Sequence, residues 1–456
     1  MKKVRFRSLV VMIMALMFLG GIGFFLFEYA TCSGEWAINS INGHTSGNGL
    51  STAGRILDRN DVVLAQSING NRVYSDNKDV RKALLHVVGD EHNYISTSIQ
   101  CRYSAELMGY NIITGYGLPK SLGLSRDIKL TLDSELCKLA YQKLSGHKGS
   151  VAVYNYKTGE IVCIASTPTY DINNPPKELN SKDEYDGVYL NRAFSSSFTP
   201  GSSFKIITAI AAIDNIDGLE SKKFYCPGHL EVDGKKITCL GRHGNIGIKE
   251  AMARSCNVAF AEMAMEMGAD KMLSKALELG FNEGMNVDKI PIEKSQYTVD
   301  NISRVDLGWS GIGQYKDLIN PVHILTVLGA IANQGVSVQP YIVDSISSPF
   351  LPSFGEKSAK TRKILSAETA NKVKELMRYA VKSNYGDYRF KNIEVGAKTG
   401  TGEVGENKKP NSCVVGFSVT ESCPLAFVVI VENGGFGIST AMPIASAVMN
   451  MAAKRI

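Results

Sequence analysis

The longest apolar stretch of the chain lies near its N-terminus. The 19 residues from Leu9 to Phe27 carry no charge, and Lys or Arg occupies four of the first seven positions. About 20 apolar residues are enough for a helix to span a bilayer, and basic flanking residues favour the cytoplasmic side. The pattern predicts a single-pass cell-membrane protein with a cytoplasmic tail over residues 1–8, a transmembrane helix over residues 9–27, and the remaining chain outside the cell.

A cleaved signal peptide is the alternative interpretation of this segment. The apolar run is long for a signal peptide, and Glu28–Cys32 contains no small-x-small cleavage site. Tyr29 also stands where a lipoprotein attachment site has an aliphatic residue. These features favour an anchor that is not cleaved.

The region after the anchor has the pattern of a small mixed module. Residues 33–51 are rich in Gly, Ser and Asn and indicate a spacer. Gly54–Ala65 then reads as a strand, a polar turn and a second strand. We expect residues 28–127 to form an α+β module without chemistry of its own.

A longer series of elements follows, and residues 128–456 are expected to form a second domain. Gly149–Tyr154 and Glu160–Ser166 are apolar strands, and Lys157–Gly159 between them reads as a hairpin turn. Further strands and a closing helix are expected towards the C-terminus. Together they predict an α+β fold with an antiparallel sheet flanked by helices. The later strands are expected at Glu394–Gly402, Ser412–Val419 and Leu425–Val431, and the closing helix at Thr440–Lys454.

The composition is that of a globular protein. The 456 residues are 44% hydrophobic and 21% charged, and the length suggests two or three domains. The formal net charge is +6, but four of the positive charges belong to the short N-terminal tail. The rest of the chain is nearly balanced, so nothing argues for a nucleic-acid partner.

A candidate nucleophile begins the apolar helix predicted over residues 206–212. Pro200 and Gly201 break the preceding element, which places Ser202 in the first turn of this helix. Lys205 lies three residues further on and therefore on the same helix face. A serine needs a base to become a nucleophile, and burial lowers the pKa of a lysine towards that role. Ser202 and Lys205 therefore form a sensible acylation pair.

Two further motifs follow this Ser-x-x-Lys motif in order. Ser255, Cys256 and Asn257 form a Ser-x-Asn motif between two predicted helices, Ile248–Arg254 and Val258–Met267. A connection of this kind can direct side chains into a cleft. The third motif is a Lys-Thr-Gly-Thr sequence on a predicted strand, and it consists of Lys398, Thr399, Gly400 and Thr401.

The Ser-x-x-Lys, Ser-x-Asn and Lys-Thr-Gly motifs in this order are the signature of penicillin-binding proteins and serine β-lactamases. With its anchor, the chain resembles the class B penicillin-binding proteins, which are membrane-anchored D,D-transpeptidases of peptidoglycan synthesis. The segment over Gly54–Ala65 resembles part of their non-catalytic pedestal, except that Asp61 replaces a turn glycine. Trp309–Gln314 resembles their Gly-Gln-Gly segment, with Tyr315 in place of the second glycine.

The resemblance implies a role for each matching residue. Ser202 would attack the penultimate D-Ala carbonyl of a peptidoglycan stem peptide, and β-lactams would acylate the same hydroxyl. It implies no cofactor, and it implies a polytopic membrane partner, a glycan polymerase of the shape, elongation, division and sporulation (SEDS) class. The implied catalytic residues are Ser202, Lys205, Ser255 and Lys398, and the implied substrate-binding residues are Asn257, Thr399, Gly400 and Thr401.

The nine cysteines are scattered and do not resemble a disulfide framework. Cys226, His229, Cys239 and His243 nevertheless lie close together in sequence. A Cys226–Cys239 disulfide, free thiols and a zinc site are open alternatives. Cys256, the middle residue of the Ser-x-Asn motif, is expected to be a buried bystander.

Four other functions compete with transpeptidation. A β-lactamase shares the motifs but is usually soluble, and a D,D-carboxypeptidase would let water resolve the ester. A β-lactam sensor would carry more membrane helices, and a non-enzymatic scaffold would not need every motif residue. The anchor, the pedestal and the intact motifs together favour a transpeptidase.

Overall fold

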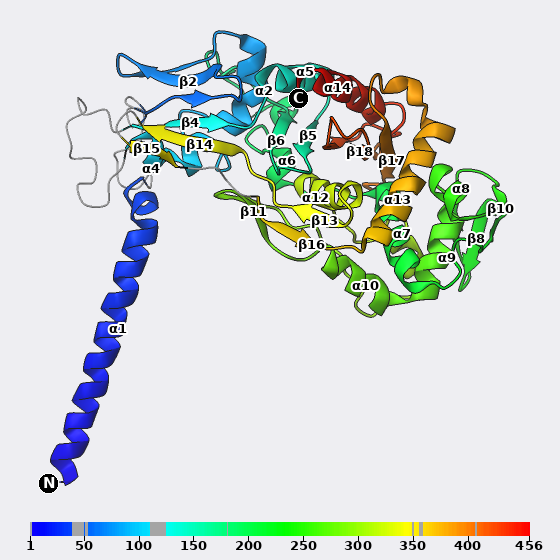
Figure 1. Ribbon diagram of the computed structural model, residues 1–456, viewed down its shortest axis with the longest axis horizontal. Coiled ribbons are helices and arrows are strands. Elements are labelled where there is room, and N and C mark those ends of the chain that lie inside the picture. The colour runs from blue at the N-terminus through cyan, green and yellow to red at the C-terminus, as the bar shows by residue number, and fades with distance from the viewer. Residues whose placement is uncertain are drawn as a thin grey trace.

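The computed structural model describes residues 2–38, 50, 53–109, 125–179, 181–348, 351–354, 359–405 and 408–456. The chain begins with the helix α1 (Lys2–Ile38), which projects away from the rest of the molecule (Figure 1). Its apolar span is exposed along its length, and among the described residues it is the helix long and apolar enough to cross a membrane. Most of the predicted spacer over residues 33–51 lies outside the described residues.

A six-stranded sheet stands next to the anchor helix. The predicted strand, turn and strand are present as β1 (Ile56–Leu57) and β2 (Val63–Ile68), which pair antiparallel. Asp61 in their turn has a φ of 63°, the conformation that favours glycine at this position. The strand order is β15-β14-β4-β1-β2-β3, and the remaining strands are β3 (Asn71–Tyr74), β4 (Asp127–Leu130), β14 (Val343–Ser348) and β15 (Leu351–Phe354).

Strands from two distant parts of the sequence therefore build this sheet. β1 to β3 precede residue 128, whereas β14 and β15 come from residues 343–354. Three helices accompany the N-terminal strands, and Asn77 caps the first of them by accepting from two backbone N–H groups. They are α2 (Lys78–Val88), α3 (Ile99–Arg102) and α4 (Ser104–Leu107).

The larger body is built on a five-stranded antiparallel sheet with the order β17-β18-β19-β5-β6. Four of its five strands are entirely buried, because helices cover both faces, whereas the edge strand β17 carries Gly, Thr and Lys residues. The predicted α+β class and antiparallel sheet are confirmed. The strands are β5 (Gly149–Asn155), β6 (Ile161–Thr167), β17 (Val395–Gly402), β18 (Asn411–Ser418) and β19 (Leu425–Val431).

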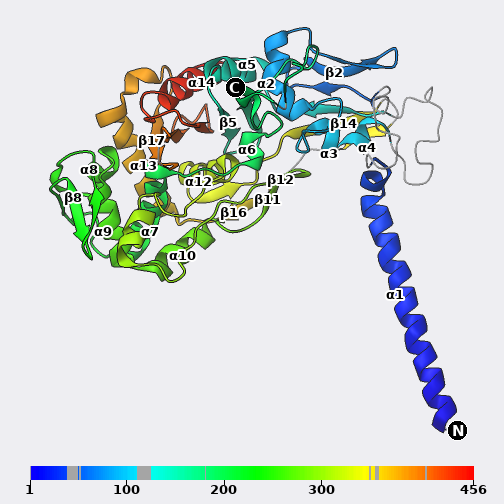
Figure 2. The same cartoon turned by 180° about the vertical axis from the view of Figure 1, so that it is seen from behind.

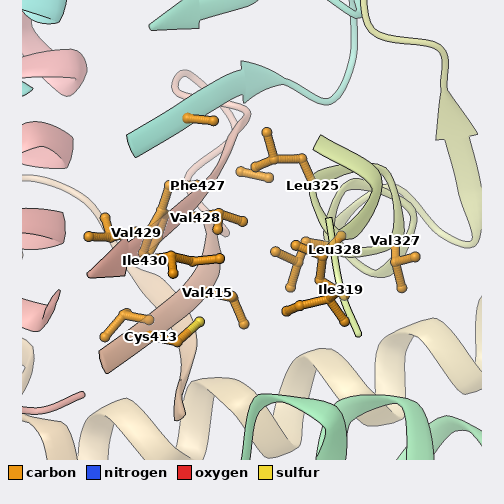
Figure 3. Close-up of a cluster of buried hydrophobic side chains, with 14 of the residues drawn as sticks. Ile319, Leu325, Val327, Leu328, Cys413, Val415, Phe427, Val428, Val429 and Ile430 are labelled. Carbon is orange, nitrogen blue, oxygen red and sulfur yellow. The ribbon is translucent and has the colours of Figure 1, made fainter. Parts of the chain in front are cut away.

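Helices α5 (Ser134–Leu144) and α14 (Ala441–Arg455) cover one face of this sheet, and α12 (Pro321–Ala332) and α13 (Ala367–Ala380) lie on the other (Figure 2). Side chains of α12 meet those of β18 and β19 in an apolar core (Figure 3). α12 begins at this place because the Asn320 side chain accepts from two backbone N–H groups and Pro321 occupies the first turn.

The remaining helices and short strands connect and flank these main elements. The helices are α6 (Arg192–Ser195), α7 (Lys205–Asn215), α8 (Ile248–Ala253), α9 (Asn257–Met267), α10 (Ala269–Glu278) and α11 (Arg304–Ser310). The short strands are β7 (Phe224–Cys226), β8 (His229–Val232), β9 (Lys235–Thr238), β10 (Gly244–Ile246), β11 (Met285–Val287), β12 (Ile290–Ile292), β13 (Val336–Val338) and β16 (Thr361–Lys363).

Candidate active site

The candidate nucleophile lies in a short turn that leads into α7. Ser202 was expected in the first α-helical turn, but the structure places it in a 3₁₀ turn over Gly201–Phe204, and α7 begins at Lys205. Gly201 has a φ of 52°, which a residue with a side chain adopts only with strain. The Pro-Gly pair therefore sets the direction from which Ser202 enters the site.

This turn lies directly against the edge strand β17. A Cβ atom on Gly201 would lie 2.2 Å from the carbonyl oxygen of Thr401, and one on Gly402 would lie 2.2 Å from that of Thr199. A Cβ on Gly400 would also meet this turn's backbone, at 2.6 Å. The glycines of the third motif thus allow the nucleophile turn to approach the strand. The family resemblance also implies that Gly400 contacts substrate, and this close packing is a separate reason for a glycine at the position.

Lys205 is fully buried, and its Nζ contacts Ser202, Ser255 and Asn257 of the first two motifs. Its Nζ lies 3.0 Å from Ser202 Oγ, 2.7 Å from the Ser255 carbonyl oxygen and 2.6 Å from Asn257 Oδ1. Burial lowers the pKa of Lys205 well below its ordinary value, and the nearby Lys398 lowers it further. A neutral amine fits this geometry, with two N–H groups on the two acceptors and a lone pair facing the serine hydroxyl.

Ser255 connects the two lysines. Its Oγ lies 3.1 Å from Lys205 Nζ and 3.0 Å from Lys398 Nζ. Its φ of 55° places a residue with a side chain in the left-handed region, which is uncommon and strained. This conformation places the hydroxyl between the two amines, after the end of α8 and before α9.

Lys398 is the second fully buried lysine, and it lies on β17. Burial lowers its pKa to about 7. Its Nζ also lies 3.2 Å from the hydroxyl of Tyr385, a residue that no motif includes and that sequence reasoning missed. A chain of hydrogen-bonding groups thus runs from Ser202 through Lys205 and Ser255 to Lys398.

The two buried lysines are not paired with a carboxylate in the described part of the chain. Among the described residues, no carboxylate lies within hydrogen-bonding or ion-pairing distance of Lys205 or Lys398. Thr399 and Thr401 lie half-buried beside Lys398 on the same strand. A cation with neighbouring hydroxyls is suited to bind a carboxylate.

Two amide side chains fix the walls of the site. The Nδ2 group of Asn257 donates to the Thr238 carbonyl over 2.7 Å, so its amide is held in place while its oxygen accepts from Lys205. Gln314 donates to the Thr401 carbonyl over 2.9 Å and accepts from the Glu403 N–H over 3.1 Å. The loop that contains Gln314 therefore braces the end of β17 despite Tyr315 in place of a glycine.

The cysteine and histidine residues form a different cluster from the one expected. Cys226, Cys239, His243 and Cys256 each offer a ligand atom within 4.8 Å of the others. His229 does not join them; it is 44% exposed and faces Glu231. Cys256, expected to be a bystander, takes its place because the residue caps α9 next to Cys239.

All four members of the cluster are held by local backbone structure. Cys226 ends β7, Cys239 follows β9, and His243 precedes β10, which pairs with β7. Cys226, Cys239 and Cys256 are free thiols, so the Cys226–Cys239 disulfide is not formed. Hydrogen bonds from the Cys256 thiol and the Asn257 N–H hold the pKa of Cys239 below its ordinary value. The cluster therefore favours a thiolate immediately beside the Ser-x-Asn motif.

The second Lys-Thr-Gly sequence, Lys157–Gly159, forms the turn between β5 and β6, as predicted. Lys157 Nζ donates a hydrogen bond to Asn333 Oδ1, and it makes no contact with the motif at Lys398 among the described hydrogen bonds. The structure thus separates this copy from the site and brings the three other motifs together.

Comparison with known proteins supports the same fold and family. The family described as "Penicillin binding protein transpeptidase domain" matches residues 149–450. The chain is similar to the peptidoglycan D,D-transpeptidase PbpA of Mycolicibacterium smegmatis, with 28% identity over 312 residues that cover 64% of this chain and 63% of that relative. The matched region is therefore less than two thirds of that relative's length.

Solved structures share the fold over most of the chain. The D,D-transpeptidase domain of a peptidoglycan glycosyltransferase from Eggerthella lenta has a TM-score of 0.77 and 26% identity, covering 88% of this chain and 98% of that one. The ceftriaxone acyl-enzyme complex of penicillin-binding protein A from M. tuberculosis has a TM-score of 0.78 and 24% identity, with the same coverage. The chain belongs to the penicillin-binding protein transpeptidase family and is a class B penicillin-binding protein.

Proposed function

We propose that this protein is a peptidoglycan D,D-transpeptidase that works through an acyl-enzyme on Ser202. The observation that carries the proposal is the position of Lys205, whose buried Nζ lies 3.0 Å from Ser202 Oγ. Its lowered pKa suits a base that takes the serine proton. β-Lactams, which mimic the D-Ala-D-Ala end of the stem peptide, react with the same hydroxyl.

In acylation, Ser202 Oγ attacks the carbonyl carbon of the penultimate D-Ala, and Lys205 accepts the hydroxyl proton. The developing oxyanion is bound by the backbone N–H groups of Ser202 and Thr401, and one such donor typically contributes about 3 kcal/mol. The C–N bond then breaks, Ser255 passes a proton to the leaving amine, and D-Ala departs. The relay is supported by the 3.1 Å contact between Ser255 Oγ and Lys205 Nζ.

Substrate binding falls to the remaining motif residues. Lys398, Thr399 and Thr401 hold the terminal carboxylate of the stem, and the unpaired charge of Lys398 supports this role. Asn257 holds the donor amide while it fixes Lys205. An amine from a second stem peptide then attacks the ester and forms the cross-link.

The placement of the enzyme at the membrane is part of the proposal. α1 anchors the chain in the cell membrane with its N-terminus in the cytoplasm. Residues 28–127, which include the end of α1, form a pedestal whose sheet is completed by strands of the transpeptidase domain over residues 128–456. The exposed apolar surface of α1 supports the anchor. A SEDS-class glycan polymerase is the proposed membrane partner, and cell shape or division is the setting.

The four-residue cluster beside the Ser-x-Asn motif supports a structural zinc site formed by Cys226, Cys239, His243 and Cys256. Three thiolates and an imidazole are common zinc ligands, and tetrahedral geometry places such donors about 3.8 Å apart. Neighbouring backbone amides would stabilise the thiolates, since Asn257 N–H already donates to Cys239. Bound metal would hold the start of α9, and with it Asn257, in position.

The test is cross-linking by the full-length protein in detergent. The protein is given a pentapeptide stem as donor and a second stem as acceptor, and released D-Ala and cross-linked product are measured together. We expect both products from the wild type and neither from Ser202→Ala. Ser145→Ala, which removes the serine of another Ser-x-x-Lys sequence at an exposed position, should match the wild type. D-Ala release with only hydrolysed tetrapeptide would instead indicate a carboxypeptidase.

A further inference from the structure

A π-helical turn over Val381–Tyr385 follows α13 and lies beside β17. Gly386, with a φ of 92°, ends it. π turns are rare and occur frequently at functional sites. None of the three motifs includes this segment, so its position next to Lys398 needs its own explanation.

Tyr385 at the end of the turn is buried, and its hydroxyl points at the third motif. The oxygen lies 3.2 Å from Lys398 Nζ and 3.3 Å from Thr399 Oγ1. The Thr399 N–H also donates to it over 3.5 Å. One phenol oxygen therefore touches two of the three side chains that are proposed to hold the substrate carboxylate.

The same turn is fastened to α8, the helix that precedes Ser255. Asn384 donates through Nδ2 to the Ala253 carbonyl over 2.8 Å, and Ala253 is the last residue of α8. Consecutive residues of one turn thus reach α8 and β17. The turn holds the second and third motifs at a fixed separation, which the contacts of Ser255 with both lysines require.

The chemistry of a phenol suits this place. A phenol oxygen can accept hydrogen bonds from both an ammonium group and a neighbouring hydroxyl. The Tyr385 oxygen accepts from Lys398 Nζ and from Thr399 Oγ1, so it fixes the direction of both side chains at the third motif. A lysine side chain is flexible, so a fixed partner for its Nζ reduces the freedom lost when substrate binds.

We infer that Tyr385 is a positioning residue that orients Lys398 and Thr399 towards the carboxylate of the stem peptide or the β-lactam. The inference rests on the proposed function, because it assigns the carboxylate to Lys398 and Thr399. Tyr385 acts through these two residues and does not touch the reacting atoms.

The test compares benzylpenicillin with its methyl ester, which lacks the carboxylate charge, on full-length protein in detergent. The second-order rate of Ser202 acylation is measured for both compounds. Tyr385→Phe removes only the phenol oxygen, and a lost hydrogen bond to a charged group is expected to lower the penicillin-to-ester rate ratio about tenfold. Tyr154→Phe is the matched control, because Tyr154 is buried and its hydroxyl has no hydrogen-bond partner among the described residues.

The rate ratio does not depend on the fraction of protein that is folded, so a loss of folded protein does not imitate the effect. An unchanged ratio in Tyr385→Phe, with both rates equal to wild type or both reduced alike, would overturn the inference and leave Tyr385 a packing residue. Wild-type protein that fails to react with penicillin at Ser202 would overturn the proposed function and the inference with it.

Discussion

The strained backbone of Ser255 leads to a prediction that separates stability from activity. Ser255 has a φ of 55°, and the left-handed conformation costs a residue with a side chain about 1–2 kcal/mol. Glycine adopts this conformation without that cost. Ser255→Ala and Ser255→Gly both remove the hydroxyl that contacts Lys205 and Lys398, but only the glycine variant also removes the strain.

We expect Ser255→Gly to be more stable than Ser255→Ala. The full strain of about 1–2 kcal/mol is reduced by the greater freedom of glycine in the unfolded chain, which leaves roughly 0.5–1 kcal/mol. Acylation by penicillin should fall equally in both variants, by about 100-fold or more, because both lose the same proton relay. Denaturant unfolding and acylation kinetics measure the two effects separately.

The helical residue Ser446 provides a control of opposite sign. It lies in α14, where glycine is about 1 kcal/mol less favourable than alanine, so Ser446→Gly should be the less stable member of its pair. Equal stability of the two Ser255 variants would refute the strain argument. Acylation at the wild-type rate in either would remove Ser255 from the proposed machinery.

Three further predictions follow from the site. Lys398→Met should abolish acylation, yet the variant should unfold at a higher denaturant concentration than wild type at pH 7. The pKa of Lys398 is about 7 in the folded protein and 10.5 in the unfolded chain, so the stability of the wild type rises with pH between these values. The stability difference between variant and wild type should therefore shrink towards pH 10.5, and a constant difference would contradict the lowered pKa. Gly402→Ala should impair acylation about tenfold or more in kinetic assays, because its Cβ would lie 2.2 Å from the Thr199 carbonyl oxygen, while Gly284→Ala, with no contact closer than 3.7 Å, should not. Protein purified without chelator should contain about one zinc per chain by elemental analysis, and it should lose thermal stability when the metal is removed. Cys256→Ser should lower the metal content, whereas His229→Ala should not.

Local patterns explain why much of the larger domain could be predicted from sequence. β5, β6, β18 and β19 are apolar runs of strand length that end at turn residues, and burial on both faces gives them this composition. The motif residues could be assigned because their chemistry requires particular side chains. Ser202, Lys205, Ser255 and Lys398 do converge in space.

Contacts between distant segments explain what the sequence did not indicate. β14 joins β4 and so connects residues 343–348 to the sheet beside the anchor, a pairing that no local pattern marks. Tyr385 was missed because its hydroxyl reaches Lys398 only through the π turn. The spacing of aromatic residues in the sequence does not predict such a contact.

The metal-ligand set shows the limit of sequence spacing in another way. Spacing grouped His229 with Cys226 because they are three residues apart. Pairing of β7 with β10 instead brings His243 to Cys226, and the cap of α9 adds Cys256. His229 begins the β8–β9 hairpin and is directed to Glu231 at the surface.

The attachment point of a β-lactam decides whether Ser202 is the nucleophile. Full-length protein would be incubated with benzylpenicillin, its intact mass measured, and the modified peptide sequenced by mass spectrometry. We expect a mass increase of one whole penicillin molecule, located on Ser202 and absent from Ser202→Ala. An adduct on any other residue, or an unmodified Ser202 in folded protein, would contradict this expectation.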